Sequence, residues 1–354
     1  MTGSALVLTG LPSLAPLLAR GALLSPFKRP SPDAEFPRTR LVLPGLRIDL
    51  ARLAAYERVC GFPTGEDALP VTYPHVLGFP LAMRLMSERG FPLPLLGLVH
   101  TSITLTRHTA MPATGDHELS VHVEGLAPHR RGTEATVVTE VRSGTDVVWE
   151  SRSTYLARHR TGRPAGASGT ADELTTAPPG TTTHRPAAPS PGEAGPPTGT
   201  PAHAATERPT GPPAHAATER PTGPPAHAAT ERPTAPPDAP DAPEDHAPLP
   251  PVADWRLAGD VGRRYGAASG DRNPIHLHPL TARLFGFPRA IAHGMWTVAR
   301  CLAAHGTPDS CHVRADFRAP VLLPGTVTYA ARDGRFELRG KDDRLHVTGG
   351  VYPV

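Results

Sequence analysis

The 354-residue sequence contains few cysteines and few aromatic residues, and its charge is nearly balanced. Its three cysteines, Cys60, Cys301 and Cys311, are an odd number at spacings that fit neither a disulfide framework nor a zinc site. A reducing cytoplasm is therefore the expected location. The formal net charge is only +3, and no dense lysine and arginine cluster with interleaved aromatic residues occurs, so no nucleic-acid partner is expected.

Apolar runs of membrane-spanning length are also missing from the sequence. The stretch 5–24 comes nearest, but Pro12, Pro16 and Arg20 interrupt it and no basic residue precedes it. We interpret residues 1–35 as an N-terminal arm with a local helix. No membrane span is expected elsewhere in the chain.

Proline and glycine, by contrast, are abundant, with 45 and 34 residues. The ten-residue sequence PAHAATERPT occurs at 201–210, 213–222 and 225–234, with almost no large apolar residue. Such a segment cannot bury a core, so residues 161–247 are predicted to form a long disordered linker. Its regularly spaced histidines suggest metal binding as an alternative, but single histidines twelve residues apart make a poor chelate, and repeat expansion is the favoured interpretation.

The two segments on either side of this linker, 36–160 and 248–354, have the patterns of folded domains. In both, residues with a helical period precede residues that alternate with the period of two typical of strands. This order indicates the α+β class. Helices are expected at 50–61, 79–86, 260–268 and 294–304, and strands at 41–48, 98–105, 119–123, 136–141, 147–156, 311–317, 326–331, 336–339 and 345–352.

The residues best suited to catalysis lie in the stretch 269–295, SGDRNPIHLHPLTARLFGFPRAIAHGM. Asp271 and His276 are an acid and a base at close spacing, and Asn273-Pro274 between them predicts a bent, non-helical segment that lets both face one pocket. Gly294 comes at the start of an apolar helical pattern, where backbone N–H groups are free to bind an anionic oxygen. Addition of water to a carbon β to a thioester carbonyl needs these three components.

A structural interpretation of the same residues is simpler. Asp-x-Asn-Pro by itself is an ordinary turn, and a histidine after it is more often a surface residue. The helix start twenty residues downstream is what favours catalysis.

With that array, the stretch resembles the hydratase motif of the MaoC-like family of hot-dog-fold hydratases and dehydratases, in which an Asp, an Asn-Pro and a His stand in this order. The resemblance implies a double hot-dog fold with an active second half. The first half is degenerate, because no Asp and His pair occurs near its Tyr73-Pro74-His75 segment. One departure is His278, where many relatives carry an acidic residue.

The resemblance also implies roles for individual residues. Asp271 and His276 hold and activate water, and the Gly294 N–H binds the thioester oxygen. Asn273, His293 and Met295 are expected to bind substrate.

The implied reaction is the interconversion of trans-2-enoyl and (R)-3-hydroxyacyl thioesters by a hydro-lyase, with coenzyme A or an acyl carrier protein as the carrier. No metal or other cofactor is expected. An intramolecular pseudo-dimer is expected, with further homodimerisation left open. Two alternatives are a hot-dog acyl thioesterase, against which the hydratase-type spacing argues, and a non-catalytic acyl-binding or assembly subunit.

Overall fold

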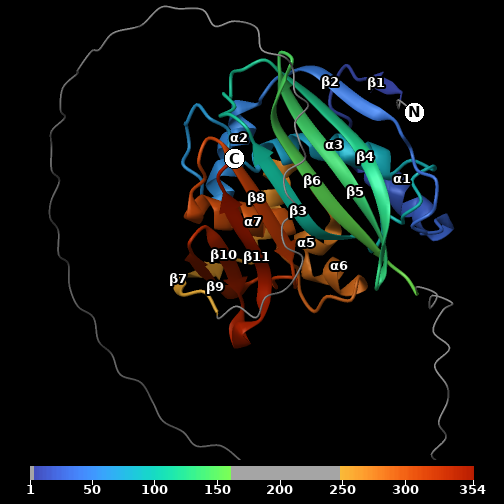
Figure 1. Ribbon diagram of the computed structural model, residues 1–354. Helices are drawn as coiled ribbons and strands as arrows, with labels where there is room; N and C mark the ends of the chain where they lie inside the picture. The colour runs from blue at the N-terminus through green and yellow to red at the C-terminus, as the bar shows by residue number, and fades with distance from the viewer. Residues whose placement is uncertain (1–3, 161–247) are drawn as a thin grey trace, which may run out of the picture. The chain divides into compact units, whose positions relative to one another are not determined.

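The computed structural model describes residues 4–160 and 248–354, and by their contacts these two segments belong to one unit (Figure 1). The predicted linker, 161–247, lies outside the described residues. None of the helices within the two described segments is long and apolar enough to cross a membrane.

A single sheet of eleven strands runs through both described segments, in the order β1-β2-β4-β5-β6-β3-β8-β11-β10-β9-β7 (Figure 1). The two halves repeat one topology once the extra edge strand β1 is set aside: in both β2–β6 and β7–β11, the spatial order counted along the chain is first, third, fourth, fifth, second strand. The strands are β1 (Ala5–Val7), β2 (Arg40–Leu46), β3 (Val99–Arg107), β4 (His117–His129), β5 (Gly132–Ser143), β6 (Asp146–Arg158), β7 (Pro251–Leu257), β8 (Cys311–Phe317), β9 (Gly325–Arg332), β10 (Arg335–Arg339) and β11 (Leu345–Tyr352).

The halves join through an antiparallel pairing of β3 with β8, in which Ile103 lies opposite Ala315. Neighbouring strands are antiparallel throughout the described sheet except at its N-terminal edge, where β1 pairs with β2 in parallel. This is the predicted double hot-dog fold.

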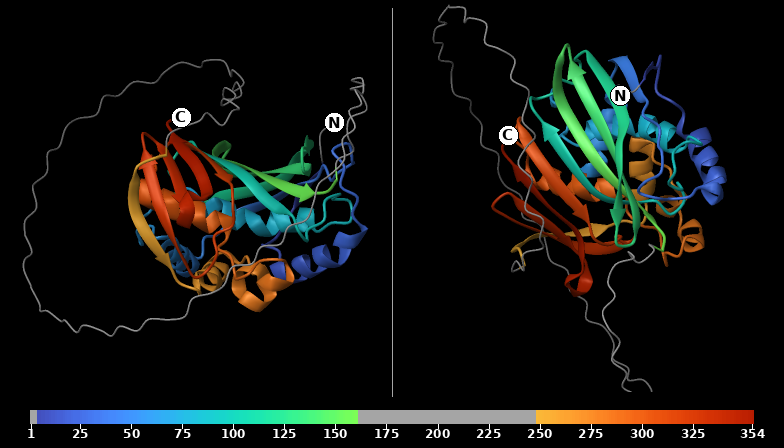
Figure 2. Two further views of the ribbon diagram at one scale, coloured as in Figure 1. Left: turned by 90° about the horizontal axis from the view of Figure 1, so that it is seen from below. Right: turned by 45° about the vertical axis from the view of Figure 1, so that its right-hand side comes forward.

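Seven α-helices accompany the described part of the sheet: α1 (Leu14–Leu24), α2 (Leu50–Cys60), α3 (Tyr73–Met86), α4 (Val261–Ser269), α5 (Pro274–Leu277), α6 (Pro279–Leu284) and α7 (Gly294–His305). The long helix of the first half, α3, packs on β4 and β5, and its counterpart α7 packs on β10. Figure 2 shows both helices on the same side of the sheet. They form because their apolar residues recur at the helical period and meet the sheet.

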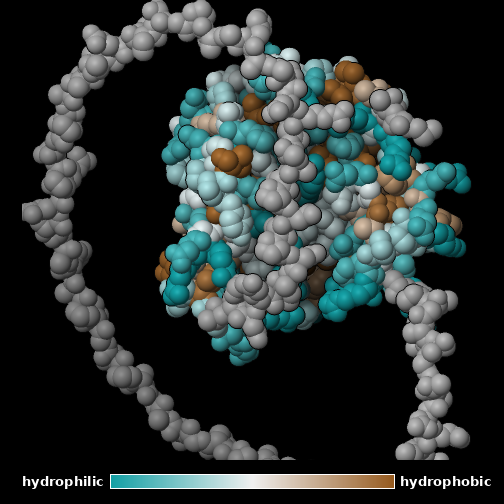
Figure 3. All heavy atoms as spheres, viewed as in Figure 1, coloured by the Kyte–Doolittle hydropathy of each residue, from teal (hydrophilic) through white to brown (hydrophobic). Residues whose placement is uncertain are grey.

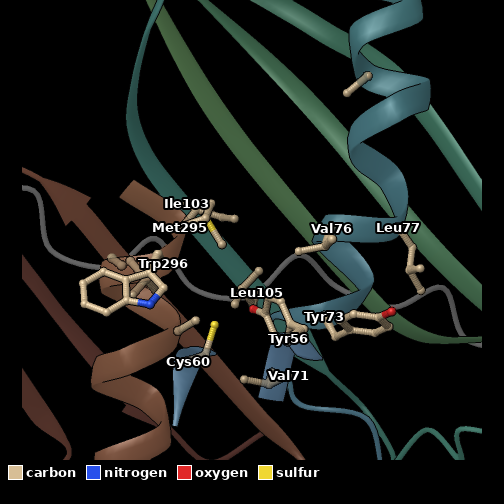
Figure 4. Close-up of a cluster of buried hydrophobic side chains, with 14 of the residues drawn as sticks. Tyr56, Cys60, Val71, Tyr73, Val76, Leu77, Ile103, Leu105, Met295 and Trp296 are labelled. Atoms are coloured by element: carbon tan, nitrogen blue, oxygen red, sulfur yellow. The ribbon is translucent and has the colours of Figure 1, made fainter. Parts of the chain in front are cut away.

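The buried core is shared between the halves (Figure 4). Met295 and Trp296 of α7 belong to the same cluster as Tyr56 and Cys60 of α2 and Ile103 of β3, and the Trp296 indole N–H donates to the Val59 carbonyl at 2.8 Å. The second half therefore depends on the first for part of its core.

On the face drawn in Figure 3, exposed apolar side chains occur in small separate groups among hydrophilic ones.

Three expectations about the elements need correction. No strand was expected before the helix at 260–268, but Pro251–Leu257 form the edge strand β7. Helix α3 begins at Tyr73 rather than Phe79, because Pro74 lies in its first turn, where proline's fixed φ and missing N–H are tolerated. The predicted helix of the N-terminal arm is α1, and the strand β1 precedes it.

Candidate active site

The segment that carries Asp271 is held between α4 and α5. Helix α4 ends at Gly270, whose φ of 85° is left-handed and whose N–H donates to the Gly266 carbonyl at 3.0 Å. Asn273 then has the extended backbone expected before a proline. The expected non-helical bend ends there, because Pro274 begins the four-residue helix α5, and the prediction that the whole segment is non-helical was wrong.

Asn273, predicted to bind substrate, caps this short helix. Its side-chain oxygen accepts from the Ile275 N–H at 3.4 Å, and its own N–H donates to Asp271 Oδ1 at 3.1 Å. Both bonds fix the angle between Asp271 and His276. His278, the departure from the family pattern, caps α6 through Nδ1, which accepts from the Leu280 N–H at 3.2 Å.

His276 is buried, with only 8% of its surface exposed, and its tautomer follows from its hydrogen bond. Nδ1 donates to the Ile291 carbonyl at 2.9 Å, which leaves Nε2 with a free lone pair. Burial lowers the pKa of His276 below 6.5, while Asp271 and the Ile291 carbonyl act in the opposite direction. The imidazole is therefore neutral near pH 7 and suited to accept a proton.

His293 lies directly against the predicted acid and base. Its ring stacks on that of His276 with centroids 3.7 Å apart, and Nε2 donates to the Asp271 backbone carbonyl at 2.9 Å. The same nitrogen lies 3.8 Å from Asp271 Oδ2. Burial, followed by the His276 ring, lowers the pKa of His293 to about 3, although Asp271 opposes the shift. His293 is thus a neutral group that fixes the Asp271 backbone.

Gly294 begins α7 directly after His293, as predicted. A Cβ atom at this position would lie 2.9 Å from the ring of Phe317, so glycine allows the ring to pack against the helix start. The first N–H groups of a helix have no acceptor within it and attract an oxygen that gains negative charge. Met295, also predicted to bind substrate, belongs to the shared core, with 8% of its surface exposed, and its role in binding stays a prediction.

Asp271, His276 and His293 each offer a ligand atom, and these three atoms lie within 4.8 Å of one another. Two histidines and a carboxylate at this spacing fit a small cation such as zinc. The Ile291 carbonyl, which accepts from Nδ1 of His276, would orient the His276 ring equally well for such a role. The expectation of a metal-free site stays a prediction.

Two positioning features were not predicted from the sequence. Gly262 and Gly266 lie one turn apart on α4, and a Cβ atom on Gly262 would lie 2.0 Å from the His276 carbonyl oxygen. Arg52 of α2 donates to the carbonyls of Ala268 and Ser269 at 2.7 and 2.6 Å, and so caps α4 from the other half. The two glycines at i and i+4 could have indicated the close packing of α4. No local pattern indicated the contacts of Arg52.

The chain matches known proteins over both halves. Residues 247–349 match the family model described as MaoC like domain. Over 309 residues the chain is 31% identical to 3-hydroxyacyl-thioester dehydratase X of Mycobacterium tuberculosis, covering 86% of this chain and 84% of the relative.

Solved structures agree with this relationship. A crystal structure of HtdX from Mycobacterium tuberculosis superimposes with a TM-score of 0.61 at 27% identity, covering 89% of this chain and all of that chain. A MaoC-like dehydratase from Phytophthora capsici shares the fold, with a TM-score of 0.55 at 15% identity over 90% of this chain and 95% of that chain. The chain therefore belongs to the MaoC-like family of hydratases and dehydratases, which are hydro-lyases, in its two-domain double hot-dog form.

Proposed function

We propose that this chain catalyses the reversible hydration of trans-2-enoyl thioesters to (R)-3-hydroxyacyl thioesters. One observation carries the proposal: the free Nε2 of His276 and the carboxylate of Asp271 share a small space beside the start of α7. The name of the Mycobacterium tuberculosis relative, a 3-hydroxyacyl-thioester dehydratase, supports the same reaction.

The proposed chemistry gives a step to each of these groups. Asp271 and His276 hold a water molecule, and one of them removes its proton as the oxygen bonds to C3 of the enoyl chain. The charge that develops on the thioester oxygen is stabilised by the Gly294 N–H. The pair then transfers this proton to C2, so that water has been added across the double bond. Dehydration follows the same steps in reverse.

The surroundings of the pair suit this role. His276 is held neutral by burial, so it can accept a proton near pH 7. The Asp271 side chain keeps 25% of its surface exposed, so solvent reaches the carboxylate. Coenzyme A or an acyl carrier protein would carry the acyl group. We also propose a cytoplasmic location, because the three cysteines are buried free thiols of the kind that a reducing compartment maintains.

The test is a spectrophotometric assay with enoyl-CoA esters of graded length, in which hydration removes the absorbance of the conjugated thioester. Asp271→Asn and His276→Ala are each expected to lower kcat by about 10² to 10⁴, the range for a placed proton-transfer group. Asp260→Asn is the matched control, since this carboxylate pairs with Arg264 near the molecular surface. Near-wild-type turnover by either site variant would refute the assignment, and chromatography of the product on a chiral column tests the (R) configuration.

A further inference from the structure

One histidine of the half that lacks the motif lies near the catalytic carboxylate. His75 is in the first turn of α3 and has 7% of its surface exposed. Its Nδ1 is buried and finds no hydrogen-bond partner among the described residues. Buried polar atoms are almost always paired in folded proteins, because an unpaired one costs folding free energy. An unpaired nitrogen at this position therefore needs an explanation.

A continuous series of rings leads from His75 to the helix start at Gly294. The His75 and His100 rings stack with centroids 5.9 Å apart, and the His100 ring lies 4.7 Å from that of Phe317. Phe317 is the ring that packs against Gly294. The Tyr155 ring also stacks on the His100 ring, with centroids 4.6 Å apart.

His100 has an unpaired nitrogen as well. Its Nε2 is buried without a hydrogen-bond partner in the described segments. Two unpaired imidazole nitrogens from the first half therefore lie within a few ring contacts of the second half's catalytic groups. Packing alone would favour apolar side chains here.

The carboxylate of Asp271 is close enough to His75 to influence its protonation. Burial lowers the pKa of His75 to about 4, and the opposing influence comes from Asp271. His75 is consequently neutral near pH 7, and a neutral imidazole can donate or accept a hydrogen bond without a change of charge.

We propose that His75 binds the oxygen at C3 of the substrate, which is the incoming water in hydration and the hydroxyl group of the 3-hydroxyacyl thioester in dehydration. The oxygen then lies between Asp271 and His276 of one half and His75 of the other. His100 is a positioning residue that holds the His75 ring in its plane. This inference rests on the proposed function, and it gives the degenerate half a direct part in the reaction.

The test compares His75→Asn with His75→Leu in the full chain, because the two side chains are similar in size and differ in hydrogen bonding. His75→Leu is expected to lower kcat/KM for enoyl-CoA hydration by about 10- to 100-fold, as for loss of one buried hydrogen bond. His75→Asn is expected to stay within about 5-fold of wild type, since its amide replaces the bond. His122→Leu is the control, because Nδ1 of His122 is likewise without a partner among the described residues, while its charged neighbours all belong to the first half: Arg40, Glu140, Glu124 and Arg152.

A second measurement separates contact with the C3 oxygen from a purely structural role. His75→Leu should weaken inhibition by the 3-hydroxyacyl-CoA product and leave inhibition by the saturated acyl-CoA of the same length unchanged. If circular dichroism shows that the leucine variant is unfolded, His75→Gln and His75→Met form the equivalent pair.

Equal activity of the polar and apolar variants, or equal weakening of both inhibitors, would overturn the inference while the wild type remained an active hydratase. An inactive wild type would overturn the proposed function and this inference with it.

Discussion

A methyl group added at Gly262 should move His276 without altering any of the proposed catalytic residues. The Cβ atom of an alanine at this position would lie 2.0 Å from the His276 carbonyl oxygen and 3.0 Å from the carbonyl carbon. Carbon and oxygen atoms in close contact are normally about 3.3 Å apart, so α4 and α5 must separate by about 1.3 Å. The obstacle is backbone at both sides, which no change of rotamer can relieve.

The expected effects on activity and on stability differ greatly in size. A displacement of about 1 Å at a catalytic group costs about 100-fold in rate. Stability should change less, because overpacking costs about 1–3 kcal/mol while alanine in place of glycine gains about 1 kcal/mol in a helix. Gly262→Ala should therefore lower kcat/KM for enoyl-CoA hydration about 100-fold, with a loss of about 1 kcal/mol in the free energy of unfolding.

The assay is the loss of enoyl-thioester absorbance, with urea unfolding measured on the same preparations. Gly125→Ala is the matched control, because a Cβ atom at Gly125 would have no atom within 4 Å. If Gly262→Ala kept kcat/KM within about 3-fold of wild type, α4 would not be what positions His276.

Two further predictions concern protons and metals. Because burial lowers the pKa of His276 below 6.5, kcat/KM should stay level as the pH falls from about 8 to 6.5 and decline only below that, where the base becomes protonated; an acid limb centred above 6.5 would contradict the neutral imidazole. A chelator should leave activity unchanged, whereas added Zn²⁺ should inhibit competitively by occupying Asp271, His276 and His293. Loss of activity on chelation, restored by Zn²⁺, would instead identify a metalloenzyme.

Elements with a strong periodic pattern were predictable from the sequence. Helix α7 begins at Gly294 as expected, and β8 has the predicted bounds, because each buries one complete face. Strand β7 was missed because it is a short edge strand in which only Leu257 is fully buried, although Ala253, Trp255 and Leu257 alternate with the exposed Asp254 and Arg256. Helix α5 was missed because the conformational rule for residues before proline applies to Asn273 and does not prevent Pro274 from starting a helix.

In the candidate site, too, the local contacts could be predicted from the sequence and the distant ones could not. Asp271 and His276 are five residues apart, so the turn between them was enough to predict their proximity. Arg52 reaches α4 from the other half of the chain, 216 residues before Ala268, and its contribution depends on the pairing of β3 with β8. No single-residue pattern reports a contact across more than two hundred residues.

The dependence of one half on the other leads to the last prediction, which concerns the second half expressed alone. Residues 248–354 contain Asp271, His276 and Gly294, but separation would leave β8 as an unpaired edge strand. It would also remove the Arg52 cap of α4 and the core that Trp296 shares with α2.

We therefore expect 248–354 alone to lose most of its kcat/KM, and residues 1–160 added in trans to restore it, because the described halves meet through a strand pair and buried side chains. The gain should be largest for long-chain substrates, if the first half lines the acyl site. Measuring kcat/KM for a short and a long enoyl-CoA, with and without the first half, decides between the two outcomes. Full activity of 248–354 alone on both substrates would show that the degenerate half has no part in catalysis.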